Sequence, residues 1–171
     1  MPETLNLTPS ETVTVRSHTP DALEVEGRYG PEGTPPPKHF HPDQDEHFEV
    51  LEGTLTARVD GTERTLAAGD TIDIPRGAVH QMWNPGAEPA RVVWTTTPAG
   101  RMLQWFETLG ALQREGRVAG NGLPGPLAFA AYLTEYRDVI RLAAGPATPV
   151  VGGVLAALAP LGRMRGYRSA K

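Results

Sequence analysis

Cysteine is absent from this chain of 171 residues. Its absence excludes a disulfide framework and any thiolate metal site, and it fits a reducing compartment, so we expect a cytoplasmic protein. The first residues lack a basic cluster followed by an apolar run, which argues against a signal peptide. The sequence contains neither a glycine-rich phosphate loop nor a serine nucleophile motif. We also expect that no segment is long enough to cross a bilayer.

Excess positive charge is also lacking, because the net charge is −4. Nucleic acid is therefore not an expected partner. The charge is unevenly placed: residues 1–100 carry 16 acidic and seven basic side chains, whereas residues 101–171 carry four acidic and nine basic ones. Opposite charges on the two parts would attract each other within or between subunits, and we expect a homodimer. The alternative is a basic tail that touches an anionic surface.

Short strands are predicted throughout the first hundred residues, where apolar side chains alternate with polar ones or run between turn residues. The predicted strands are Thr12–Ser17, Ala22–Tyr29, Glu46–Leu51, Thr54–Val59, Glu63–Leu66, Thr71–Ile74, Val79–Trp83 and Arg91–Thr96. Strands of this length and spacing are typical of a sandwich or a small barrel.

After Pro98 the apolar period lengthens to that of a helix. A first stripe contains Trp105 and Phe106, which we expect to anchor a helix on the outside of the barrel; the alternative is that they form part of a pocket wall. A second stripe extends from residue 129 to 143, and a third from 150 to 161. The third has no clear polar face, so the barrel or a second subunit should cover it. An interfacial membrane helix is the less favoured interpretation.

Three histidines and a glutamate occupy two glycine-bounded blocks. The first block reads Gly-x5-His39-x-His41-x4-Glu46-x6-Gly, and the second reads Gly-x5-Pro-x-Gly-x2-His80-x3-Asn. In an extended strand His39 and His41 point to the same side, so both can bind one ion. His47 should point away from Glu46 for the same reason. Neutral imidazole suits Zn, Cu, Fe and Ni, and a carboxylate adds a hard oxygen ligand.

These two blocks resemble the paired motifs of the cupin superfamily, and the likeness covers roughly residues 10–98. The resemblance implies a mainly β protein with a double-stranded β-helix (cupin or jelly-roll) barrel over residues 1–98, followed by a C-terminal α-helical extension over residues 99–171. It also implies that His39, His41, Glu46 and His80 hold one divalent transition metal ion, which could be Fe, Mn, Ni, Co, Cu or Zn. The motifs do not specify a reaction, because one fold hosts many functions.

A substrate pocket is expected beside the ion, lined by Phe48, Met82 and Trp94, with Phe40 and Tyr29 near its rim. The alternative is that these side chains are ordinary barrel core. We predict a metal-dependent enzyme, dioxygenase-like or isomerase-like, that acts on a small oxygen-bearing molecule, with Glu46 as the catalytic base. A non-enzymatic small-ligand-binding cupin and a structural or assembly module are the alternatives.

Overall fold

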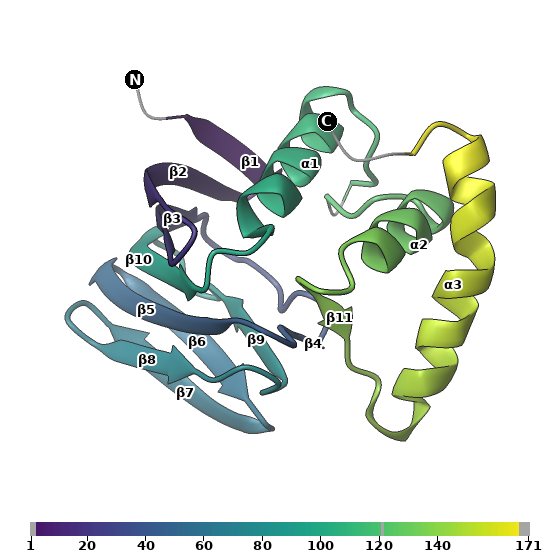
Figure 1. The fold of residues 1–171 in the computed structure, drawn as a ribbon. Coiled ribbons are helices and arrows are strands. Elements are labelled where there is room, and N and C mark those ends of the chain that lie inside the picture. The colour runs from purple at the N-terminus through teal and green to yellow at the C-terminus, as the bar shows by residue number, and fades with distance from the viewer. Residues whose placement is uncertain (1–2, 121, 168–171) are drawn as a thin grey trace.

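The computed structural model describes residues 3–120 and 122–167, which form two antiparallel β-sheets and a group of helices (Figure 1). The first sheet has the order β1-β2-β3-β10-β5-β8 and the second has the order β11-β4-β9-β6-β7. The strands are β1 Thr4–Thr8, β2 Glu11–His18, β3 Leu23–Tyr29, β4 His39–Phe40, β5 Asp45–Glu52, β6 Thr54–Val59, β7 Thr62–Ala67, β8 Thr71–Ile74, β9 His80–Trp83, β10 Ala90–Thr97 and β11 Arg141–Leu142. The helices are α1 Met102–Arg114, α2 Pro126–Glu135 and α3 Thr148–Met164, with a 3₁₀ turn at Gly145–Ala147.

Side-chain alternation along the strands determines which residues face the interior. In β3 every second residue is buried, and the same is true of β10, its partner in the first sheet. The buried faces of the two sheets enclose an apolar core, as in a β-sandwich or barrel. The fold is a double-stranded β-helix with C-terminal helices, which confirms the predicted fold class. The sequence prediction did not include the edge strand β1.

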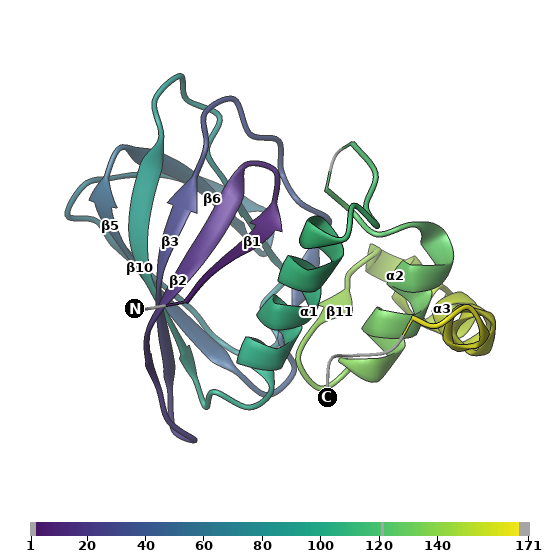
Figure 2. The same ribbon diagram turned by 90° about the horizontal axis from the view of Figure 1, so that it is seen from above.

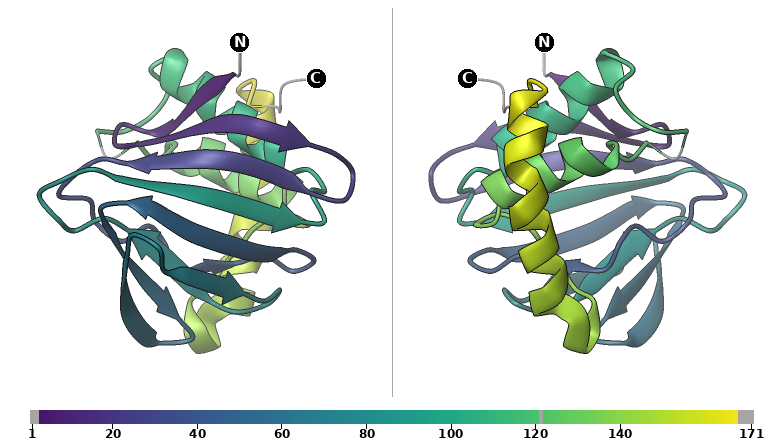
Figure 3. Two further views of the ribbon diagram at one scale, coloured as in Figure 1. Left: turned by 90° about the vertical axis from the view of Figure 1, so that its left-hand side faces the viewer. Right: turned by 90° about the vertical axis from the view of Figure 1, so that its right-hand side faces the viewer.

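The three α-helices stack outward from the barrel (Figure 2). α1 lies next to β1, α2 lies beyond it, and α3 is the outermost helix (Figure 3). The second helix was predicted to continue to residue 143, but α2 ends at Glu135. Residues 141–142 instead pair with β4, which has a free edge that needs backbone partners. The extension therefore adds a strand to the barrel, and the division after residue 98 stays a prediction.

α3 packs on α2 and exposes much of its outer surface. At Gly162 the two helices touch so closely that a Cβ would clash with the backbone oxygen of Leu127. On the outer side Val150, Val154 and Met164 are 67%, 53% and 83% exposed. The segment Gly145–Met164 is long and apolar enough to span a membrane. The prediction that no segment has that length was therefore wrong, although one such helix is weak evidence for a membrane.

Candidate metal centre

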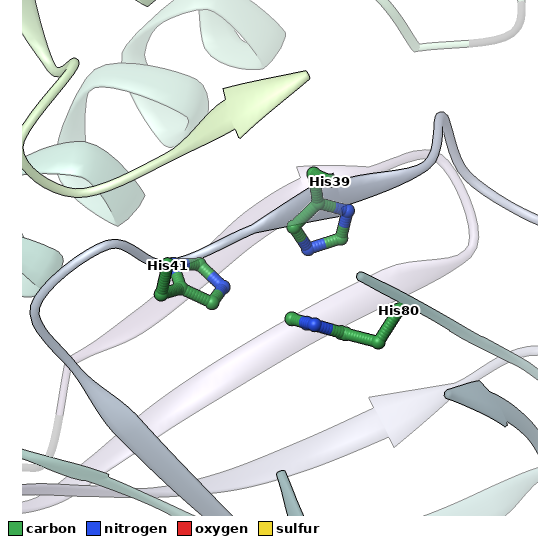
Figure 4. Close-up of side chains that lie close together, drawn as sticks. All are labelled: His39, His41 and His80. Carbon is green, nitrogen blue, oxygen red and sulfur yellow. The ribbon is translucent and has the colours of Figure 1, made fainter. Parts of the chain in front are cut away.

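Three imidazole rings lie close together beside β4 and β9 (Figure 4). His39 lies on β4, His80 is its cross-strand partner on β9, and His41 follows directly after β4. One nitrogen from each ring lies within 4.8 Å of the others. The ring centroids of His39 and His80 are 4.4 Å apart, and His41 lies 5.3 and 5.2 Å from them. The expected convergence of His39 and His41 on His80 is thus present in the structure.

Backbone carbonyl groups fix the tautomer of all three rings. Nδ1 of His39 lies 2.9 Å from the oxygen of Pro37, and Nδ1 of His80 lies 3.0 Å from that of Ala78. Nδ1 of His41 lies 2.6 Å from the oxygen of Val139. A carbonyl oxygen only accepts hydrogen bonds, so each Nδ1 carries a proton and donates it. Each Nε2 is therefore the nitrogen left to bind an ion, the arrangement typical of histidine ligands.

Glu46 on β5 places its carboxylate beside this cluster. Its Oε1 accepts a hydrogen bond of 3.0 Å from the indole nitrogen of Trp94 and lies 3.4 Å from Nε2 of His41. Its Oε2 lies 3.0 Å from Nε2 of His80. Among the described residues, Oε2 is a buried oxygen with no hydrogen-bond donor. A buried carboxylate oxygen without a partner is costly unless something else binds it.

Burial and mutual charge set the protonation of these groups. Burial, together with the neighbouring His80 and His41, lowers the pKa of His39 to about 3. Burial also disfavours charge on Glu46, but the surrounding imidazoles outweigh this effect and lower its pKa to about 2. For His80, burial opposes protonation, yet the carboxylate of Glu46 raises its pKa. The centre therefore combines an anionic oxygen with a neutral imidazole at His39, and both groups suit a cation.

The donor set fits a divalent transition metal ion. Three imidazole nitrogens and one carboxylate oxygen form a mixed set that Fe, Mn, Co, Ni, Cu and Zn all accept. His41, His80 and Glu46 are each at most 4% exposed, so water competes little for an ion bound there. The unpartnered Oε2 of Glu46 supplies the remaining hard donor. That all four residues bind one metal ion remains a proposal, which the short distances among them support.

A cavity of about 150 Å³ opens from the metal centre into the barrel. Phe48, Met82, Trp94 and Tyr29 are among the residues that line it, and their contact with a substrate stays a prediction. Phe40 does not line it, because it lies between His39 and His41 and points to the opposite face of the strand. It lines a separate hollow between β11, α2 and α3, so its predicted place at the rim was wrong.

The C-terminal extension forms much of the cavity wall. Trp105 and Phe106 on α1 line the cavity, and the ring of Phe106 lies 4.9 Å from that of Trp94. The expectation that both aromatic residues only anchor a helix on the outside of the barrel was wrong. Further residues of the extension that line the cavity are Met102, Leu109, Leu123, Pro124, Phe129, Leu133, Ile140 and Leu142. The barrel and its extension thus enclose one binding space.

Two groups near the cavity were missed by the sequence analysis. The carbonyl group of Val139 positions a histidine 98 residues before it in the chain, and no sequence signal marks a backbone acceptor. Glu11 lines the cavity from β2, where it shares the inward face with Val13. The sequence did contain a sign of this position, because strand alternation places the carboxyl group of Glu11 on the same face as apolar side chains. The predicted strand began one residue later and left Glu11 out.

Comparison with protein families and curated proteins adds sequence relatives. Residues 25–96 match the family model described as a cupin domain. An oxidoreductase of Arthrobotrys oligospora is 36% identical over 84 residues, which are 48% of this chain and 31% of that protein. The tetracenomycin polyketide synthase protein TcmJ of Streptomyces glaucescens is 38% identical over 61 residues, 36% of this chain and 41% of that protein. Quercetin 2,3-dioxygenase of Bacillus subtilis is 31% identical over 98 residues, 57% of this chain and 28% of that protein. The chain thus spans less than half the length of these relatives.

Solved structures share the barrel. An RmlC-like cupin from Shewanella frigidimarina superposes with a TM-score of 0.55 at 19% identity, over 60% of this chain and 89% of that one. KdgF from a Halomonas species superposes with a TM-score of 0.53 at 22% identity, over 59% of this chain and 92% of that one. At such identities the likeness concerns the fold alone.

Proposed function

The chain belongs to the cupin superfamily through residues 25–96, and on that premise we propose that it is a metal-dependent cupin acting on a small oxygen-bearing molecule. The observation that supports this proposal most directly is the arrangement of His39, His41 and His80. Their Nδ1 atoms are bound to backbone carbonyl groups, which leaves their Nε2 atoms free to bind an ion beside an apolar cavity. Dioxygenation or isomerisation is the reaction class that we propose. The names of the similar oxidoreductase and dioxygenase support this choice without assigning a substrate.

A metal ion held by the three histidines and Glu46 would act as a Lewis acid that orients the oxygen of a bound molecule. The residues of the chain have separate tasks. Trp94 donates its N–H to Oε1 of Glu46 and fixes the orientation of the carboxylate. We propose Glu46 as the catalytic residue, because its carboxylate is ionised at neutral pH and lines the cavity. Phe48 and Phe106 exclude water from the same space.

A non-enzymatic cupin would use the same cavity to hold a ligand without changing it. Incubation of the metal-loaded protein with candidate phenols and keto acids under air distinguishes these functions. Consumption of the compound supports the enzyme, whereas saturable binding without consumption supports a binding module. A cavity that admits no ligand would leave an assembly role, which the exposed apolar helix α3 would serve.

The metal site itself is tested by a matched pair of histidine variants. His80→Ala removes one of the proposed ligands, and we expect bound metal to fall about tenfold or more. His47→Ala is the control, because His47 is exposed on the other face of β5 and its Nδ1 lies 2.7 Å from Asp73. Elemental analysis of both proteins gives the metal content. Equal losses from the two variants would show that the metal does not bind at this cluster.

We also propose a homodimer that buries the outer face of α3. Its apolar side chains Val150, Val154 and Leu161 are all at least 50% exposed, and a second copy would remove this surface from water. A membrane surface is the competing partner, since the same helix has the length and composition of a membrane segment. Location in the cytoplasm likewise remains a prediction.

A further inference from the structure

A second pair of polar groups faces the cavity away from the histidines. Glu11 on β2 and Tyr29 on β3 are cross-strand partners, and the charge of Glu11 raises the pKa of Tyr29. Both residues line the cavity that contains the metal centre. Neither residue has a role in the proposed metal site.

Strand register places this pair at the other end of the sheet. Tyr29 pairs with Ala90 on β10, whereas Glu46 pairs with Thr96 on the same strand. These two positions on β10 are six residues apart, or about 20 Å of backbone at ~3.3 Å per residue. The distance between the side chains across the cavity is shorter than this backbone path, because the charge of Glu46 still raises the pKa of Tyr29. The cavity thus has two polar ends.

The environment of Glu11 is unusual for a carboxyl group. Burial raises its pKa to about 7, although the hydrogen bond from Tyr29 works in the opposite direction. A carboxylate has room for about four hydrogen bonds, and the hydroxyl of Tyr29 can supply only one of them. Perturbed carboxyl groups in cavities are common at functional sites. Glu11 therefore has acceptor capacity to offer to a bound molecule.

The pair also stands at a junction between two spaces. Glu11 and Tyr29 line an adjoining hollow of about 170 Å³, which continues toward Ser10, Thr34 and Asn84. A molecule that occupies the inner cavity therefore has one end at the histidines and the other end at this junction. Such a molecule meets hydrogen-bonding groups at both ends.

The walls between the two ends are aromatic. The rings of Phe48 and Trp94 are stacked at 5.1 Å with 25° between their planes, and Phe106 meets Trp94 edge-on. Trp105 lines the same space. Flat rings pack well against stacked and edge-on aromatic side chains, so these walls suit a planar ligand.

We propose that Glu11 and Tyr29 form a second recognition site, which binds a hydroxyl group at the far end of a flat ring whose other oxygen faces the histidines. The substrate class is then a hydroxylated aromatic or enolised ring with oxygen at both ends. This inference rests on the proposed function and extends it, because it concerns the end of the cavity that the metal ligands do not reach.

Ligand binding to the zinc-loaded full-length protein tests the inference without requiring turnover. One pair of probes is hydroquinone and phenol. The second pair is the naphthalene diol with hydroxyl groups at opposite ends and naphthol, so the two diols offer two different distances between their oxygens. Calorimetry under argon gives the affinities. We expect the better-fitting diol to bind about tenfold more tightly than its single-hydroxyl partner, as a hydrogen bond to a charged group allows.

Two variants identify the groups responsible. In Glu11→Gln and Tyr29→Phe the preference for the diol should fall to about threefold or less, while binding of the single-hydroxyl probe is unchanged. Glu49→Gln, an exposed carboxylate on β5, is the control and should keep the full preference. Because the carboxylate form of Glu11 accepts better, the preference in the wild type should also rise between about pH 6 and pH 8. In Glu11→Gln it should not change with pH.

The outcomes separate this inference from the proposed function. A zinc-loaded wild type that binds diols and single-hydroxyl probes equally would overturn the second site and leave the metal centre intact. Retention of the full preference in Glu11→Gln and Tyr29→Phe would overturn it as well. A protein that fails to hold zinc would contradict the metal site, and with it both proposals.

Discussion

Replacement of Glu11 by glutamine should make the protein more stable at alkaline pH. The carboxyl group of Glu11 has a pKa of about 7 in the folded chain, against an ordinary value of 4.5. Each pKa unit corresponds to ~1.36 kcal/mol, so burial of the ionised group costs up to about 3 kcal/mol. This figure is an upper value, because Glu11 is only half-buried and water moderates the cost. Glutamine has nearly the same shape as glutamate but does not ionise.

The sign of the effect depends on which state binds more protons. Between pH 4.5 and about 7 the unfolded chain has lost the proton of Glu11, whereas the folded chain still holds it. The free energy of unfolding of the wild type therefore falls as the pH rises through this window, and it stays low above pH 7. The free energy of unfolding of Glu11→Gln should not show this fall, because glutamine does not ionise. Its advantage should approach its maximum at about pH 8 and vanish below about pH 4.5.

Urea denaturation at about pH 8 and about pH 5 measures the difference between the variant and the wild type. Comparison at equal pH cancels the contributions of the histidines, which titrate in both proteins. The exposed residue Glu49 provides the control, and Glu49→Gln should change the free energy of unfolding by less than about 0.5 kcal/mol at either pH. A Glu11→Gln protein that is less stable than the wild type at pH 8 would refute the reasoning. It would show that the carboxylate is a structural group.

Metal should leave the protein below the ordinary histidine pKa of ~6.5, because protons compete for the Nε2 atoms; metal retained at about pH 3 in a dialysis series contradicts this. Phe106→Ala should cost about 3–5 kcal/mol in urea and also change ligand selectivity, because the side chain is 1% exposed and lines the cavity. Unchanged selectivity would return Phe106 to a purely structural role. Light scattering at micromolar concentration should give a dimer for the wild type and a monomer for the double variant Val150→Gln and Val154→Gln. A monomeric wild type would refute the dimer.

If ionised Glu11 destabilises the folded chain, this result would support its proposed role in ligand binding. Residues that bind ligands are often held in environments that destabilise the folded chain, and their replacement by neutral groups stabilises the protein at the expense of function. Higher stability of Glu11→Gln together with a weaker preference for diols would be consistent with a recognition site. If Glu11 were purely structural, its replacement by glutamine would not both stabilise the protein and weaken its preference for diols.

Local regularities in the sequence predicted the barrel and the metal cluster. Strand alternation places His39 and His41 on one face whatever the rest of the chain does, and it places His47 on the other. The glycine-bounded blocks position the turns, so the resemblance to cupins predicts both the fold and the place of His80. The faces of the strand residues depend on neighbours in the chain, and the place of His80 depends on a motif spacing, so the sequence alone was sufficient to predict both.

Only the tertiary structure decided what surrounds the metal centre. The carbonyl group of Val139 reaches His41 because residues 141–142 return to the edge of β4, and a backbone acceptor leaves no trace in the sequence. The helical stripe with Trp105 and Phe106 predicts an apolar contact but not its partner, since core and cavity wall need the same side chains. The pairing of Glu11 with Tyr29 likewise required the register of two strands. Contacts between distant segments depend on how the whole chain packs, and periodicity carries no information about that packing.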